Sequence, residues 1–286
     1  MKIILILTDF SENAEHAAKS AMVLSENLHT NVLLYNSCLA VPVTPYYAQG
    51  MLVAENDSWW HEESKKRLDS LAECLEPEYP AASGQFSPSI DVQCGEGSLG
   101  ENIVNIIEHH NIELIVMGAK TSSTFDHILF GSDTNSVIKQ TTRPVLVIPQ
   151  ESDLKGIQKV TFATDFSNAD LNAIDYLVTL GKVFHFNLEI VHVSVFSEND
   201  SKNEDHGKAF VSQVEELKYP NIIYKDIRGK DVINRLNHHC IETRSDILAM
   251  VHYQGSFFSG LLHQSTTKEA LSHQKMPLLV IPSKMF

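Results

Sequence analysis

Short apolar runs alternate with stretches of helical periodicity along the whole chain. Runs such as Ile3–Leu7 and Leu114–Met117 show no polar alternation, which is typical of parallel strands that are covered by helices on both faces. Behind the first run, Ser11 is placed to cap a helix. Apolar residues then recur at the spacing of one helix face: Ala14, Ala17, Ala21, Leu24 and Leu28. The pattern predicts a β-α-β-α-β-α-β-α-β unit.

The same succession of segments occurs twice, so the chain is read as a tandem repeat. The segment at residues 4–11 returns at 160–167, 31–37 returns at 187–194, 113–117 returns at 246–250, and 144–149 returns at 277–282. The histidine doublets 109–110 and 238–239 are read as a further match. We expect two α/β domains, residues 1–150 and 151–286, joined near Gln150–Gly156.

Two regions interrupt the symmetry of the repeat. Residues 38–57 read as an insertion rich in Pro and Tyr, followed by a helix around 58–76. Residues 197–205 read as a polar loop.

Composition and charge exclude several classes of protein. Hydrophobic residues make up 43% and charged residues 20% of the 286 residues, a balance typical of globular proteins, and the apolar runs are too short to span a membrane. A net charge of −14 disfavours nucleic acid and anionic membranes as partners. The four cysteines show no CxxC spacing, and the first apolar run lacks a cleavage site before Asp9, so we expect a cytoplasmic protein.

Candidate ligand groups follow the predicted strands. Asp9 and Asp165 come directly after strand 1 of each copy, where an open parallel sheet binds ligands. Gly118 follows strand 4, and Gly131-Ser132 precede a predicted helix at 134–139. Backbone N–H groups at a helix start attract phosphate, and glycine permits close approach. The same residues also serve as turn glycines and helix caps, which is the alternative interpretation.

These features together resemble the universal stress protein family, over nearly the whole chain and in both copies. The shared motifs are the Thr-Asp-Phe-Ser turn, the glycine loop followed by Gly-Ser, and the closing strand Pro-Val-Leu-Val-Ile-Pro. The resemblance implies that the first copy binds an adenine nucleotide (ATP, ADP or AMP) through these residues: Asp9, Asn36, Gly118, Thr121, Gly131, Ser132 and Thr134. It further implies a non-catalytic stress protein that requires no cofactor and has a protein partner.

The chain departs from the family pattern at two places. Thr121 stands where the loop has its second glycine, and its Cβ resists a positive φ. The second copy has Val251, Gln254 and Gln264 at the matching places, so we expect it not to be a phosphate cradle of the same type. The polar residues around that loop form either a cluster or ordinary loop surface: His252, His263, Ser265, Thr267 and Lys268.

Rival functions remain open at this point. The chain could be a scaffold of the same fold that has lost nucleotide binding, or an enzyme of the wider adenine-binding group. It carries no GxxxxGK[ST] loop, and Asp9 lacks the acidic neighbour that a receiver domain needs. The adjacent histidines diverge by about 100° on a helix, so no metal site is expected.

The resemblance also predicts how the two copies associate. In a sheet ordered 3-2-1-4-5, strand 5 is an edge, and here it is apolar in both copies, at Val145–Ile148 and Leu278–Ile281. Single-domain family members are similar in pairing this edge between subunits. We therefore expect two doubly wound five-stranded sheets arranged as an intramolecular pseudo-dimer, with a homodimer of the whole chain as an optional further step.

Overall fold

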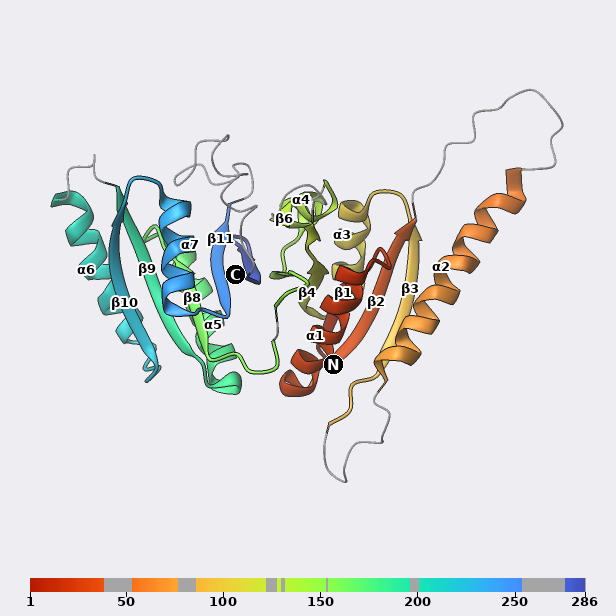
Figure 1. Ribbon diagram of the computed structural model, residues 1–286, viewed down its shortest axis with the longest axis horizontal. Coiled ribbons are helices and arrows are strands. Elements are labelled where there is room, and N and C mark those ends of the chain that lie inside the picture. The colour runs from red at the N-terminus through yellow and green to blue at the C-terminus, as the bar shows by residue number, and fades with distance from the viewer. Residues whose placement is uncertain are drawn as a thin grey trace.

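The fold is seen in a computed structural model that describes residues 1–38, 53–76, 86–121, 128–129, 132–152, 154–195, 201–253 and 276–285 (Figure 1). In the N-terminal half the elements are β1 (Ile3–Leu7), α1 (Glu12–Leu28), β2 (Asn31–Cys38), α2 (Val53–Leu75), β3 (Ile90–Glu96), α3 (Leu99–His109), β4 (Ile112–Gly118), β5 (Lys120–Thr121), β6 (Ile128–Leu129), α4 (Ser132–Gln140) and β7 (Val145–Ile148). In the C-terminal half they are β8 (Lys159–Ala163), α5 (Asn168–Phe184), β9 (Asn187–Val195), α6 (Ser201–Glu215), β10 (Ile222–Gly229), α7 (Val232–Thr243), β11 (Ile247–His252) and β12 (Leu278–Pro282).

Each half contains the predicted parallel sheet in the predicted order. The strands run β3-β2-β1-β4-β7 in the first half and β10-β9-β8-β11-β12 in the second. The two sheets are not separate, because β7 and β12 pair in antiparallel fashion and make one continuous ten-stranded sheet. The predicted fold class and the pseudo-dimer are confirmed, with the strand-5 edges as the seam.

Helices cover both faces of this sheet and divide the core into two layers. Helices α1, α2, α5 and α6 enclose one apolar cluster, and α3, α4 and α7 enclose the other. Alternate residues of each strand feed the two layers, so Ile4 and Ile6 pack on the first and Leu5 and Leu7 on the second. All four side chains are buried, which explains the uninterrupted apolar run in the sequence.

The seam is apolar on both faces. Leu146 and Leu279 contribute to the cluster beneath α1 and α5, while Val145 and Val280 contribute to the opposite one. The paired edges of β7 and β12 therefore expose no apolar surface, so they do not present the unpaired strand that would favour aggregation.

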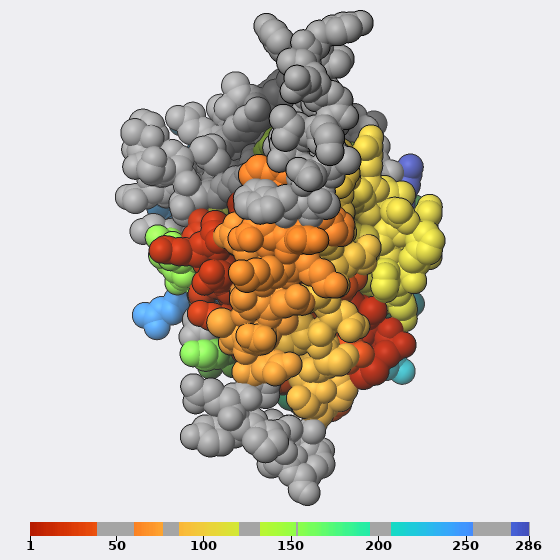
Figure 2. Space-filling view, turned by 90° about the vertical axis from the view of Figure 1, so that its right-hand side faces the viewer, coloured from red at the N-terminus to blue at the C-terminus, as the bar shows by residue number. Residues whose placement is uncertain are grey.

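Two predicted boundaries were wrong. Helix α2 begins at Val53, inside the stretch read as an insertion, and α6 begins at Ser201, inside the stretch read as a polar loop. Polar residues outnumber apolar ones in both helix starts, so periodicity gave no signal there. Figure 2 shows α2 lying along the outer face of the N-terminal half, in orange.

Candidate functional site

A cavity of about 460 Å³ opens at the carboxyl ends of β1 and β4, where chain order reverses in the N-terminal half. Five of the seven residues expected to bind nucleotide line it: Asp9, Asn36, Gly118, Ser132 and Thr134. The backbone of Thr121 lies in β5, and Gly131 lies outside the described residues. The volume falls within the usual range of small-molecule sites.

Asp9 belongs to a turn that hydrogen bonds hold rigid. Phe10 has a positive φ of 62°, and its N–H donates to Thr8 Oγ1 at 2.9 Å. Asp9 Oδ1 accepts from Ser11 N at 3.1 Å and from Ser11 Oγ at 2.6 Å, and Ser11 Oγ in turn accepts from Ala14 N. Because all these bonds to Asp9 use Oδ1, a ligand group in the cavity would be received by Oδ2.

The side chain of Asn36 is engaged within the protein. Its Nδ2 donates to the Thr8 carbonyl at 2.7 Å, and its Oδ1 accepts from Ser64 Oγ of α2 at 2.7 Å. The side chain is buried on the α2 side of the sheet. Any contribution of Asn36 to a ligand would therefore come from its backbone.

Gly118 is required by packing as well as by the cavity. A Cβ at this position would lie 2.6 Å from the carbonyl carbon and oxygen of Asn13 and 2.8 Å from Ala14 N. The end of β4 thus touches the backbone of α1, an approach that only glycine allows. Asn13 Nδ2 also donates to the Ala119 carbonyl at 2.7 Å, which fixes the same contact.

Helix α4 presents its N-terminus to the cavity. It begins at Ser132, and Thr134 in its first turn is buried. Asp133, between them, also lines the cavity. Together with Asp9 it gives two carboxylates, and the described lining residues include no Lys, Arg or His. Among the described residues, the groups that could meet a phosphate in this cavity are backbone N–H groups and hydroxyls.

The turn between β3 and α3 was missed by the sequence analysis. Gly97 has a φ of 93°, its N–H donates to the Cys38 carbonyl at 3.0 Å, and its carbonyl accepts from Ser37 Oγ at 2.9 Å. Gly97, Ser98 and Leu99 line the cavity together with Asp9. The signal that could have revealed them was a Gly-Ser pair directly before a helical pattern.

At the corresponding mouth of the C-terminal half, described side chains contact one another. Val251 pairs with Ile281 as Gly118 pairs with Ile148, so it takes the place of the loop glycine. The Tyr253 hydroxyl donates to Ser167 Oγ across this mouth. These contacts favour the expectation that the second half is not a phosphate cradle of the first kind.

A buried carboxylate lies beneath the same mouth. Asp170 takes the third position after the helix cap, where the first half has Ala14, and accepts from Thr164 Oγ1 at 2.7 Å and Asp165 N at 2.9 Å. Burial, and then the neighbouring Asp165, raise the pKa of Asp170 to about 7.

His252 is not loop surface, which was one of the two interpretations of the sequence. It ends β11, is buried, and has a pKa lowered by burial and then by Lys139 of α4 in the other half. The other four residues of that suggested cluster, His263, Ser265, Thr267 and Lys268, and also Gln254 and Gln264, lie outside the described residues.

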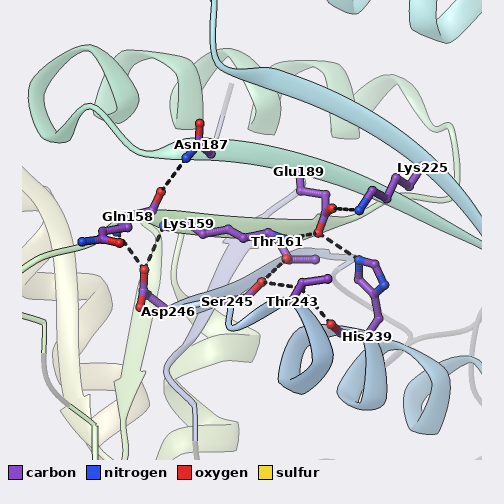
Figure 3. A network of polar contacts seen from close by, with 10 residues as sticks. All are labelled: Gln158, Lys159, Thr161, Asn187, Glu189, Lys225, His239, Thr243, Ser245 and Asp246. Carbon is purple, nitrogen blue, oxygen red and sulfur yellow. Dashed lines mark hydrogen bonds and ion pairs between the residues drawn. The ribbon is translucent and has the colours of Figure 1, made fainter.

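The C-terminal half also buries an ionic cluster, which Figure 3 shows around Glu189. Glu189 Oε2 lies 2.8 Å from Lys159 Nζ and 2.9 Å from His239 Nε2, and Oε1 lies 2.6 Å from Lys225 Nζ. Burial opposes the charge, but hydrogen bonds from Lys159, Lys225 and His239 outweigh it and lower the pKa of Glu189 to about 2. In the strand register Glu189 takes the place of Leu33.

This cluster corrects the match between the histidine doublets. His109 is the last residue of α3, whereas His239 lies four residues before Thr243 at the end of α7, so the doublets are not equivalent. Within the described part of the chain, no group of three His, Cys, Asp or Glu side chains is arranged to hold a metal ion. No described helix is both long and apolar enough to cross a membrane.

Known proteins share both the sequence pattern and the fold. Residues 1–149 match the universal stress protein family. Universal stress protein MJ0531 of Methanocaldococcus jannaschii is 29% identical over 152 residues, which cover 51% of this chain and 81% of that protein. Universal stress protein MJ0577 of the same organism is 38% identical over 52 residues, 18% of this chain, and the match spans only 32% of its length.

The structural likeness extends over both halves. The crystal structure of a universal stress protein from Archaeoglobus fulgidus has a TM-score of 0.75 at 19% identity, covering 98% of each chain. A putative universal stress protein from Pseudomonas aeruginosa has a TM-score of 0.59 at 12% identity, covering 98% of this chain and 92% of its own. At these identities the structures show the fold alone. Because the family match covers more than half of the 286 residues and the fold repeats in the second half, the chain belongs to the universal stress protein family as a tandem member.

Proposed function

We propose that this protein binds an adenine nucleotide in its N-terminal domain, residues 1–150, and that the bound state alters its affinity for a protein partner in the cytoplasm. The observation that carries the proposal is the cavity at the carboxyl ends of β1 and β4. It brings a carboxylate (Asp9), a close-approach glycine (Gly118) and the N-terminus of α4 to one place. The C-terminal domain, residues 151–286, is assigned a supporting role, because its mouth holds Tyr253 and Asp170.

The chemistry of the cavity favours binding over turnover. The Ser11 hydroxyl donates to the Asp9 carboxylate while accepting from Ala14 N, so it is held as a helix cap. Among the described lining residues no Lys, Arg or His could serve as a general acid or stabilise a leaving phosphate. Slow loss of a phosphate would then be incidental to binding.

The test is isothermal titration of ATP into the full chain, compared with Asp9→Ala and Asp165→Ala. The two aspartates are matched, because each accepts the N–H of the serine two residues on and precedes an equivalent helix. We expect Asp9→Ala to weaken binding by about tenfold or more, the worth of one charge-assisted hydrogen bond, and Asp165→Ala to leave it within about twofold. Equal losses would contradict the assignment to the N-terminal domain.

A second measurement separates nucleotide binding from the rival scaffold function. Protein purified from cells is denatured, and the released small molecules are identified by mass spectrometry. Adenine nucleotide released in amounts near that of the protein supports the proposal. No released nucleotide, together with no heat of binding for ATP, ADP or AMP, would favour a nucleotide-independent scaffold.

A further inference from the structure

A second hollow lies in the C-terminal half, on the opposite end of the molecule from α2. It is a groove of about 440 Å³ between α6 and the outer strands β9 and β10 (left side of Figure 1). The residues that define its chemistry are Phe166, His192, Lys208, Tyr224, Asp226 and Arg228. None of them takes part in the nucleotide cavity.

The groove exists because α6 does not fill the space that α2 fills in the other half. There, Ser64 Oγ bonds to Asn36 at 2.7 Å, His61 Nε2 lies 3.1 Å from Cys94 Sγ, and Arg67 lies over the Phe10 ring at 4.1 Å. In the C-terminal half the strand register puts His192 at the place of Asn36 and Asp226 at the place of Cys94. The residues of α6 that line the groove are Gly207, Lys208, Val211, Ser212 and Glu215.

Aromatic rings form one wall of the groove. The Phe166 ring lies 4.3 Å from the His192 ring and 6.3 Å from the Tyr224 ring, measured between centroids. Burial, and then Asp226, raise the pKa of Tyr224 to about 12, so its hydroxyl stays protonated at neutral pH. The wall suits a flat apolar group, because aromatic rings gain from offset or edge contacts beyond area burial.

The rest of the groove carries both signs of charge. Lys208 and Arg228 are cationic, and Glu215 and Asp226 are anionic. Asp226 Oδ1 is positioned by Ser194 Oγ at 2.7 Å and lies 3.6 Å from His192 Nδ1. Because two cations and two anions line the groove, neither a polyanion nor a polycation finds a matching set, whereas a ligand bearing one ammonium and one carboxylate finds a partner for each.

We propose that this groove binds a free amino acid with an aromatic side chain. Its ring packs against Phe166 and Tyr224, its ammonium group lies toward Asp226, and its carboxylate lies toward Arg228. The proposal does not depend on nucleotide binding, because the two sites share no residue.

The test uses L-phenylalanine as the probe, titrated into the full chain and followed by calorimetry. Phenylacetate lacks the ammonium group and phenethylamine lacks the carboxylate. Each is therefore expected to bind at least about tenfold more weakly than L-phenylalanine. Arg228→Gln is expected to cost at least about tenfold in affinity for L-phenylalanine. Lys182→Gln, which removes an exposed charge of α5 in the same half, is the matched control and is expected to leave affinity unchanged.

A second variant blocks the groove without weakening the helix. A Cβ at Gly207 would lie 3.4 Å from the Phe166 ring, an ordinary contact, so Gly207→Met directs a longer side chain toward the aromatic wall and also improves helix propensity. We expect it to abolish binding of L-phenylalanine while the protein stays folded by circular dichroism. No binding to the wild-type chain at millimolar L-phenylalanine, unchanged affinity in Gly207→Met, or an affinity for either analogue equal to that for L-phenylalanine would overturn the proposal.

Discussion

Leu146 of β7 and Leu279 of β12 are direct partners in the antiparallel pair that joins the two halves of the sheet. Both side chains are buried, so the pairing is part of the core rather than a loose contact. We predict that cysteines placed at these two positions form a crosslink within one chain on mild oxidation at low protein concentration. The four native cysteines are replaced first, so that only the new pair can react.

The measurement is gel mobility with mass analysis of the digested product. A single crosslinked peptide pair from monomeric chains is the expected result, whereas crosslinks that appear only in dimers would contradict the seam. Cysteines at Leu146 and Leu188 serve as the negative control, because Leu188 lies in β9, which the strands β8, β11 and β12 separate from β7 in the sheet order.

The carboxylate of Asp133 predicts that ATP binds with a divalent cation. Asp133 and Asp9 line a cavity whose described residues provide no side-chain cation, so the triphosphate would meet repulsion unless Mg²⁺ neutralises it. We expect chelation of Mg²⁺ to weaken ATP binding by about tenfold or more. Asp133→Asn should reduce this dependence, whereas Glu15→Gln, an acid in the first turn of α1, should not. Identical metal dependence in all three proteins would contradict the prediction.

Asp170 predicts that stability falls as the pH rises toward neutrality. Its pKa is raised from 3.8 to about 7, so between these values the folded state keeps a proton that the unfolded state has lost. That difference stabilises the folded state at the acid end of the range and disappears as pH rises through the folded pKa. The wild type should lose unfolding free energy between pH 5 and 7.5. We expect that loss to be smaller by roughly 2 kcal/mol in Asp170→Asn.

Urea unfolding at the two pH values measures this effect. Asp175→Asn, an exposed change on the same helix, should keep the pH dependence of the wild type. If Asp170→Asn also kept it, another group would have to account for the trend.

The cluster around Glu189 predicts a rescue by combined substitution. Glu189→Leu alone leaves Lys159 and His239 without their shared anion, and removing one partner of a buried ion pair costs about 3 kcal/mol. Adding Lys159→Ile, Lys225→Gln and His239→Ile restores uncharged side chains throughout, as at Leu33 and its neighbours, and should recover most of that loss. Thermal unfolding of the single and combined variants is the measurement. A combined variant that is less stable than Glu189→Leu would show that the substituted side chains cannot pack together in the C-terminal half.

The sign of its pH dependence is opposite to that of Asp170. Because the pKa of Glu189 is lowered to about 2, its contribution is present above about pH 4.5 and is lost as the pH falls below that value. Glu189→Gln removes the anion and so lowers the unfolding free energy at neutral pH. The variant should therefore begin to unfold in acid at a higher pH than the wild type.

The architecture could be predicted from the sequence because the repeated segments and the buried apolar runs recur at regular spacing. The Thr8–Ser11 turn and its counterpart are nearly identical down to the positive φ at Phe10 and Phe166. The role of Gly118 could not be predicted in the same way, because the backbone atoms that a Cβ would strike belong to Asn13, more than a hundred residues earlier. The engagement of the Asn36 amide by Ser64 was hidden for the same reason.

Polar residues inside strands were the other source of error. Glu189 reads as an interruption of an apolar run, and only its three partners from β8, β10 and α7 show why a buried strand tolerates it. Likewise the starts of α2 and α6 lack an apolar stripe, so helix and loop could not be told apart there.

The seam has a consequence for synthesis on the ribosome. Strand β7 is made about 130 residues before β12, which at roughly 5–20 residues per second leaves its apolar edge without its partner for on the order of ten seconds. During that interval the N-terminal half exposes the apolar edge of β7, and so does every other nascent chain on the same mRNA. Translation speed and chaperone supply, rather than the stability of the finished fold, would then decide how much of this protein reaches its native pairing.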